Sequence, residues 1–331
     1  MIVDTNPEFG IELTLVVPYA YWLHTQNKLE KVITSKGMKP FYYFCDDVEE
    51  KYTTRTVDNS VAGLDNIPNN WIYGTRDNAK LYKNNWPEWK GFTEGIGGCG
   101  ILDYKEWKLP NYNNNFKNDK FKLNKPYIVI CNRYNWEHGK PPAGFFSIEC
   151  LHAMFDYLTN NGYNVLYKRP SNTEFPLDQN EMTTLMNKEC LFANVKTETG
   201  DYLINDWQLA NQYPGVYLLN DLVNSHEELT YNEVQINYFT NATGFITMGG
   251  GSTLFPCLFQ KPTIAYYGGT LTEINRKDFW KDANGNKNIK NYHYMINPNL
   301  KPFVDTDGRD MVENNYGEFF NLVKETFNET N

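Results

Sequence analysis

The sequence has 331 residues, of which 41% are hydrophobic, and its 31 basic and 40 acidic side chains give a formal net charge of -9. At roughly 100–200 residues per domain, this length predicts about two domains, each large enough to bury its own core. The negative charge argues against a protein that mainly binds nucleic acid or an anionic membrane, and an aromatic content of 16% excludes an intrinsically disordered chain.

The apolar segments are short. Runs such as Leu13–Ala20 fall far below the ~20 residues of a membrane span. The first residues carry Asp4 and Glu8 before any apolar run, so we expect no secretory signal. The six cysteines follow neither a CxxC pattern nor the spacing of a zinc site. Together these features predict a cytoplasmic protein without a membrane span and without a bound metal.

The first part of the chain predicts a strand, a helix and a strand. The apolar run Glu12–Pro18 indicates a strand, Tyr21–Ser35 a helix that Gly37 ends, and Lys39–Cys45 a second strand. From there to about Trp107 the sequence shows little periodicity. Residues 109–126 are polar, rich in Asn and Lys, and have proline near both ends, which is typical of a linker.

The second part alternates strands and helices. Lys125–Cys131 is a continuous β-branched run, typical of a strand buried on both faces. The helices expected after it cover Phe145–Asn161, Gln179–Asn187, Tyr231–Thr240 and Thr253–Phe259, and the strands Tyr163–Tyr167, Gly215–Leu219, Gly244–Met248 and Thr263–Tyr267. Such alternation predicts right-handed βαβ units and a parallel sheet covered by helices.

This pattern predicts an α/β protein with two Rossmann-like units. We expect an N-terminal α/β domain over residues 1–122, a second α/β domain over 123–303, and a C-terminal segment over 304–331. An amphipathic helix is predicted at Glu313–Asn328.

The residues directly after the predicted strands form the candidate site, because ligands of parallel sheets bind beyond the carboxyl ends of the strands. These residues supply three cations, an acid and a glycine-rich turn that leads into a helix, a combination that suits a diphosphate. Each also has a structural reading, as a packing glycine, a turn cap or a partner in an ion pair. The candidates are Asn132, Arg133, Lys168, Arg169, Leu219, Asp221, Gly249, Gly250, Gly251, Ser252 and Thr253.

The segments Tyr231–Ala242, Gly244–Ile246 and Gly249–Leu254 resemble the donor half of GT-B glycosyltransferases. The resemblance is to enzymes related to plant xylosyltransferases and O-linked GlcNAc transferases, in which a helix with a Gln precedes a strand and a glycine-rich turn opens the next helix. An Arg after the first strand of that half, matching Arg133, also fits. The similarity covers roughly residues 125–269.

The resemblance implies two domains that face a cleft, with the C-terminal helix packing back on the first domain. It implies that the second domain binds a nucleotide-diphosphate sugar, a UDP-sugar above others, and transfers the sugar to a glycan or other hydroxyl acceptor. Arg133, Lys168 and the Gly249–Thr253 turn would neutralise the diphosphate, and the loop beginning at Leu219 would hold the base. No metal cofactor is expected, since cations and the helix terminus take its role.

A catalytic base is expected from the first domain, where a carboxylate or His must reach the acceptor hydroxyl. Glu94 is the first candidate, because it lies in a glycine-rich loop. Asp46 and Asp47 follow as residues after the predicted second strand, and then His24, in the predicted first helix.

Two other functions stay open from the sequence. The first is a nucleotide-sugar 2-epimerase or hydrolase of the same fold, which would form product from the donor alone. The second is a non-catalytic module that binds a glycan or a nucleotide without turnover. The Asp305–Asp307 motif matches a metal signature of other glycosyltransferases, but its glycine-containing surroundings favour a turn.

Overall fold

The computed structural model describes residues 1–4, 6, 9–55, 109–132, 145–169, 192–197, 200–249, 251–267, 297–304 and 316–328. The predicted helix at Gln179–Asn187 and the Asp305–Asp307 motif lie outside these residues. Within them, no helix combines the length and the apolar character that crossing a bilayer requires.

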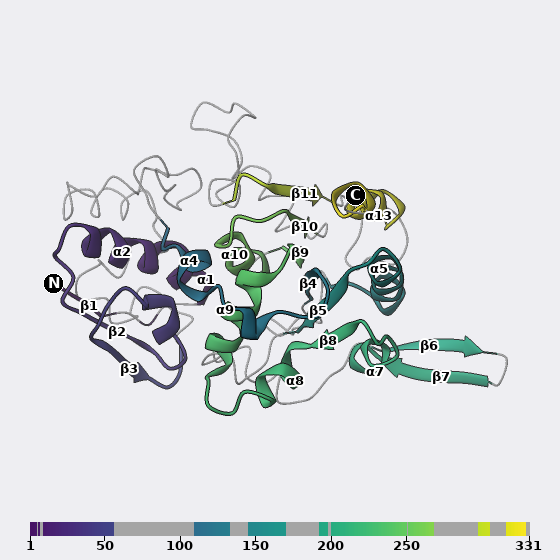
Figure 1. Cartoon of the computed structure of the whole chain (residues 1–331), viewed down its shortest axis with the longest axis horizontal. Coiled ribbons are helices and arrows are strands. Elements are labelled where there is room, and N and C mark those ends of the chain that lie inside the picture. Colours follow the sequence, from purple (N-terminus) through teal and green to yellow (C-terminus); the bar gives the residue numbers. More distant parts are fainter. Residues whose placement is uncertain are drawn as a thin grey trace.

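The first unit is a small parallel sheet (Figure 1). Its three strands, β1 (Ile2–Asp4), β2 (Lys31–Ser35) and β3 (Val48–Tyr52), lie in the order β1-β2-β3. Between β1 and β2 the chain is helical through α1 (Phe9–Ile11), the π-helix η1 (Glu12–Val16) and α2 (Val17–Thr25). A short 3-10 helix, η2 (Lys39–Tyr42), precedes β3.

The structure corrects the predictions for this unit. Glu12–Pro18 is helical, since a short apolar run without a clear period is compatible with a core helix as well as with a strand. The predicted helix over Tyr21–Ser35 ends ten residues early, at Thr25, and the chain then turns at Asn27, which has a φ of 55°. The predicted strand Lys39–Cys45 is the 3-10 helix η2 and a turn.

The predicted linker is in part a packed segment. It contains α4 (Tyr112–Phe116) and the 3-10 helix η5 (Asp119–Phe121), whose N-cap side chains are Asn111 and Asn118. The Tyr112 side chain is 1% exposed, and its hydroxyl donates to the Phe41 carbonyl at 3.0 Å. The domain boundaries after residues 122 and 303 stay a prediction.

The second unit is a parallel sheet of six strands in the order β11-β10-β9-β4-β5-β8. The strands are β4 (Tyr127–Cys131), β5 (Asn164–Lys168), β8 (Val216–Leu218), β9 (Gly244–Met248), β10 (Thr263–Tyr267) and β11 (Leu300–Val304). Numbered along the chain, these strands have the order 3-2-1-4-5-6, which is the doubly wound Rossmann order. The sequence prediction of an α/β fold with a parallel sheet is confirmed.

Helices cover both faces of this sheet. Successive side chains of each strand point to opposite faces and pack against the helices on either side. On one face, α5 (Ile148–Asn160) and α7 (Asp206–Ala210) pack beside Ile128, Ile130, Val165 and Tyr167. On the other, α8 (Leu219–Asn224), α9 (Tyr231–Asn241) and α10 (Gly251–Cys257) contribute to the cluster that holds Val129, Cys131 and Leu166. An antiparallel hairpin, β6 (Phe192–Thr197) and β7 (Gly200–Asn205), extends beyond α7 (Figure 1). These two strands were not predicted from the sequence.

The C-terminal helix α13 (Tyr316–Thr326) lies on the second sheet, beside α5 (Figure 1). The Phe319 ring packs 5.7 Å from Phe146 and 5.5 Å from Tyr266. A Cβ added to Gly244 would lie 2.6 Å from the Phe327 ring, so the start of β9 is shaped around this segment. The predicted return of this helix to the first domain is therefore corrected: its apolar stripe covers the second sheet.

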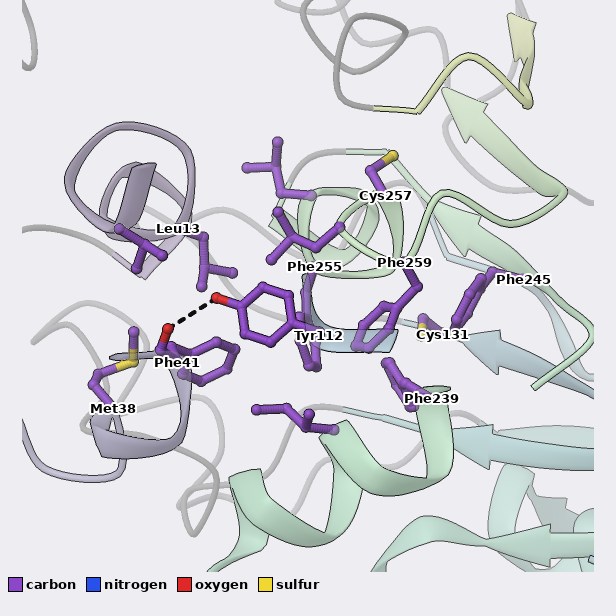
Figure 2. Packing of buried hydrophobic residues seen from close by; sticks show 14 of the residues in the cluster. Leu13, Met38, Phe41, Tyr112, Cys131, Phe239, Phe245, Phe255, Cys257 and Phe259 are labelled. Carbon is purple, nitrogen blue, oxygen red and sulfur yellow. Dashed lines mark hydrogen bonds between the residues drawn. The ribbon is translucent and has the colours of Figure 1, made fainter. Parts of the chain in front are cut away.

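One hydrophobic cluster joins the two units (Figure 2). Phe41 of the first unit packs edge-on against Phe255 of α10, with ring centroids 5.2 Å apart. Phe255 in turn stacks on Phe239 of α9 at 5.0 Å. Side chains from both units and from α4 thus share one core.

Candidate functional site

The strand order singles out the carboxyl ends of β4 and β9. The strands that follow β4 extend the sheet toward β8, whereas those that follow β9 extend it toward β11. The connections leave in opposite directions at this pair of strands, and ligands of open α/β sheets bind at such a reversal. The predicted candidates Asn132 and Gly249 follow these two strands directly, and Lys168 ends the neighbouring β5.

Lys168 points toward the face of the sheet that adjoins the first unit. Its Nζ donates to Oε1 of Gln235 in α9 at 2.9 Å. It also lies 5.9 Å from the centroid of the Phe239 ring and 5.7 Å from that of Phe255. The Gln235 amide and the two aromatic rings are themselves neutral, so these three contacts add no opposite charge beside the ammonium.

Arg169 turns to the other face. Its Nε lies 2.9 Å from the Asp206 carboxylate, which is 0% exposed, and its guanidinium stacks 4.8 Å from the Trp207 ring. The Tyr167 hydroxyl donates to the same carboxylate at 2.7 Å. Arg169 was predicted to bind the donor, but this geometry gives it a role in a buried ion pair at the start of α7.

Asn132 also has a structural role. Its Nδ2 donates to the Phe146 carbonyl and to the Tyr167 hydroxyl, both at 3.1 Å, and its Oδ1 accepts the Phe146 N–H at 2.9 Å. The side chain thus fixes the segment that leads into α5, where Ser147 caps the helix. Burial and the nearby Asp206 carboxylate raise the pKa of Tyr167 well above its usual range, so the phenol stays a donor in this network.

The glycine-rich turn is shaped by packing. The Gly249 N–H donates to the Tyr266 carbonyl at 2.6 Å, and a Cβ there would overlap the Tyr267 ring. The Thr253 hydroxyl donates to the Met248 carbonyl at 2.7 Å and lies 2.8 Å from the Thr247 hydroxyl. Gly251 begins α10. Gly250 and the side chain of Ser252 lie outside what the structure describes.

Leu219 and Asp221, which were also predicted to contact the donor, both lie at the start of α8. Leu219 is 1% exposed and starts α8, whereas Asp221 is exposed in the first turn of that helix. Arg133 lies outside the described residues.

Three of the predicted bases lie at the amino edge of the first sheet. Asp46 and Asp47 precede β3, and the Asp47 carbonyl accepts the N–H of Val32, at the start of β2. They were expected after a strand and are found before one, because the segment over 39–45 is not a strand. His24 is exposed in the last turn of α2, where its ring stacks 6.0 Å from Tyr21. Glu94 lies outside the described residues.

A polar cluster beside the first sheet was not predicted from the sequence. Glu12 of η1 is 0% exposed, and its carboxylate accepts from Arg55 Nη1 at 2.7 Å, from the Tyr42 hydroxyl at 2.8 Å and from the Thr34 hydroxyl. Burial, with Glu12 adding to it, raises the pKa of Tyr42 well above its usual range. The signal was present in the sequence, since a lone acid within an apolar run needs a buried partner.

No group of three or more His, Cys, Asp or Glu side chains gathers as a metal site in the part of the chain that the structure describes.

No protein-family model matches this sequence, and no curated protein does. Among solved structures, the iron-containing heptosyltransferase TibC is similar over 82% of this chain and 58% of that one, with 14% identity and a TM-score of 0.37. ADP-heptose LPS heptosyltransferase II of E. coli is similar over 89% and 67%, with 12% identity and a TM-score of 0.35. A family 9 glycosyltransferase of Veillonella parvula is similar over 99% and 90%, with 11% identity and a TM-score of 0.46.

This chain therefore spans a little over half the length of TibC. All three TM-scores lie below 0.5, so these likenesses establish nothing about activity, and the α/β architecture rests on the strand order. The narrower resemblance to xylosyltransferases and O-linked GlcNAc transferases is not shown by them.

Proposed function

We propose that this protein is a glycosyltransferase that moves a sugar from a nucleotide-diphosphate donor to a hydroxyl of a glycan or similar acceptor. The observation that carries the proposal is the reversal of strand order between β4 and β9, with the Lys168 ammonium beside it. That reversal favours a bound nucleotide, and the cation favours its phosphates.

In this reaction the departing nucleoside diphosphate gains negative charge as the bond to the sugar breaks. A fixed cation at the diphosphate stabilises that charge more in the transition state than in the bound substrate. Lys168 takes this role, with Arg133 and the Gly249–Thr253 turn as further predicted contacts. Because protein cations supply the charge, we expect the reaction to need no metal ion.

Several finer features belong to the same proposal. A UDP-sugar is the first donor to test, because of the resemblance of Tyr231–Leu254 to xylosyltransferases and O-linked GlcNAc transferases. That segment includes Gln235, the residue to which Lys168 donates. Glu94 remains the predicted base, and the cytoplasm remains the expected location.

The test is a thermal-shift screen of the whole chain with UDP, GDP, ADP, CMP and TDP, with and without EDTA. A ligand that binds the folded state alone raises the melting temperature by mass action. We expect one nucleoside diphosphate to raise it, equally with EDTA. If none of the nucleotides raises the melting temperature, the proposal is wrong. If EDTA abolishes the rise, the reaction does not take place without a metal ion as proposed.

Lys168→Met, followed by the same screen, tests the site. Loss of a charged hydrogen bond of about 1.5–3 kcal/mol should weaken diphosphate binding about tenfold to a hundredfold. Lys301→Met is the matched control, because Lys301 is exposed on β11 and its Nζ also contacts a neutral side chain, the Thr326 hydroxyl at 3.1 Å. Product formed from donor alone would indicate the epimerase or hydrolase, and binding without turnover the non-catalytic module.

A further inference from the structure

Trp207 is an exposed tryptophan near the candidate site. It lies at the start of α7 and is 38% exposed, and the other exposed large hydrophobic residues among those that the structure describes are Met1 and Ile2, next to β1. The guanidinium of Arg169 lies over its ring, 4.8 Å from the centroid. Since Arg169 directly follows β5, the indole lies at the carboxyl end of that strand.

A buried network holds this ring in place. The Nε of Arg169 lies 2.9 Å from the Asp206 carboxylate, which also accepts from the Tyr167 hydroxyl at 2.7 Å. The Tyr167 hydroxyl in turn accepts from Nδ2 of Asn132 at 3.1 Å. All four of these polar side chains are buried. They fix the guanidinium, and the planar guanidinium fixes the indole that stacks on it. The exposed ring is therefore preorganised, which lowers the cost of binding a ligand.

The ring lies on the side of the site where the base of a nucleotide is expected. In sheets with this strand order, the phosphates bind at the reversal of the strands, and the ribose and base extend toward the second strand in chain order. Here the reversal lies between β4 and β9, and the second strand is β5. A nucleotide with its phosphates at the reversal thus brings its base toward the end of β5, where Trp207 lies.

We propose that the Trp207 indole is the stacking platform for the base of the nucleoside diphosphate, with Arg169 as a positioning residue behind it. The identity of the ligand rests on the proposed function. A nucleobase is flat and presents a π-face, which stacks on an exposed aromatic ring. Leu219, which begins the loop expected to hold the base, is 1% exposed and has little surface to offer a ligand.

The test compares nucleotides with inorganic pyrophosphate, which carries the charge of the diphosphate but has no base. The affinities of the whole chain for UDP, GDP, ADP, TDP and pyrophosphate are measured by calorimetry. Trp207→Leu should weaken binding of the nucleotide that wild type binds by about fivefold to a hundredfold, the range of a lost base stack. It should leave the affinity for pyrophosphate unchanged. Trp207→Phe keeps an aromatic ring and should recover part of the loss.

Quenching of tryptophan fluorescence by the same nucleotide is the second readout. A base stacked on Trp207 should quench wild type more than Trp207→Phe, in which this indole is absent. The Phe variant keeps the ring over Arg169, so this readout decides the matter even if Trp207→Leu does not fold. Equal quenching in wild type and Trp207→Phe would contradict the proposal.

Trp22 provides the matched control. It lies in α2 of the first unit, is partly exposed, and also has a cation over its ring, the Lys28 Nζ at 5.9 Å from the centroid. Trp22→Leu should leave the nucleotide affinity unchanged, and Trp22→Phe should leave the extent of quenching by the nucleotide unchanged.

The outcomes separate this inference from the proposed function. Equal nucleotide affinity in wild type and Trp207→Leu would overturn the stacking platform and leave the proposed function standing. An equal loss of affinity for pyrophosphate would also overturn the platform, because the effect would not depend on the base. If wild type binds none of the nucleotides, the proposed function fails, and the platform fails with it.

Discussion

Lys168 and Arg169 are consecutive cations at the end of one strand, yet they serve different regions. Lys168 lies over α9 and α10, where a neutral amide and two aromatic rings contact it. Arg169 lies over α7, paired with a buried carboxylate. The alternation of side chains along β5 separates the two residues, so one cation joins a buried ion pair at α7 and the other reaches the face of the sheet that adjoins the first unit.

The two regions should therefore respond differently to mutation. A buried ion pair contributes little beyond an apolar pair of similar size, but the loss of one partner leaves a charge buried. Removal of Lys168 leaves the Gln235 amide, which carries no charge. The ion pair of Arg169 and Asp206 should control stability, and Lys168 should control binding of the phosphates.

The largest effect is expected from Asp206→Ala, because it leaves the Arg169 guanidinium in a buried site without its carboxylate. The free energy of unfolding should fall by about 3–5 kcal/mol, measured by urea denaturation. The double variant Arg169→Met/Asp206→Leu is the control and should lose clearly less. If Asp206→Ala is as stable as wild type, the two faces of the sheet do not differ in the way described.

A smaller loss is expected from Tyr167→Phe. The hydroxyl joins Asn132 to Asp206, and its removal should cost about 1–3 kcal/mol, since two buried groups lose a partner. Tyr163→Phe is the matched control at the other end of the β5 segment, where the hydroxyl contacts the Asn328 carbonyl at 3.3 Å near the surface. Equal losses in the two variants would argue against a special role for the buried network.

Lys168→Met should lower the free energy of unfolding by about 1–2 kcal/mol, less than Asp206→Ala does, because Met keeps an apolar contact with the Phe239 and Phe255 rings and the Gln235 amide that loses a hydrogen bond is neutral. The measurement is the same urea denaturation, without nucleotide. A loss as large as that of Asp206→Ala would place Lys168 among the structural cations and weaken its assignment to a ligand.

The exposed pair of Lys120 and Glu228 should show the smallest effect. Lys120 lies 2.9 Å from the Glu228 carboxylate and lowers its pKa below the ordinary value of 4.5. The unfolded chain thus binds a proton at higher pH than the folded chain does, so this contribution is present above about pH 4.5 and is lost as the pH falls below it. Glu228→Gln should flatten the pH dependence of stability slightly in that range, by an amount that added salt reduces. A strong, salt-insensitive effect would contradict this.

The sequence was informative where strands are buried on both faces. The β-branched runs, with helices between strands, predicted five of the six strands of the second sheet to within about two residues, whereas β11 (Leu300–Val304) was not predicted. The first unit was misread because Glu12–Pro18 is apolar without a clear period, and a helix buried on all sides gives the same pattern as a strand. The separate misreading of Lys39–Cys45 as a strand moved Asp46 and Asp47 to the wrong edge of the sheet.

The candidate site was predicted in part. The pattern of residues after strands found Lys168, but it could not tell Lys168 from Arg169 or Asn132, because the role of each depends on partners distant in sequence, such as Gln235 and Asp206. The carboxylate of Glu12 was missed for the same reason, since Arg55 and Tyr42 reach it only in the folded chain.

The aromatic cluster shared by the two units has a consequence for how such a protein can evolve. Phe41, Tyr112 and Phe255 come from three separate segments, and each completes the packing of the others. A recombination event that replaced one half with that of a distant relative would leave these rings without matching partners. The halves must therefore be inherited together, and a chimera should fold only when all three positions come from the same parent.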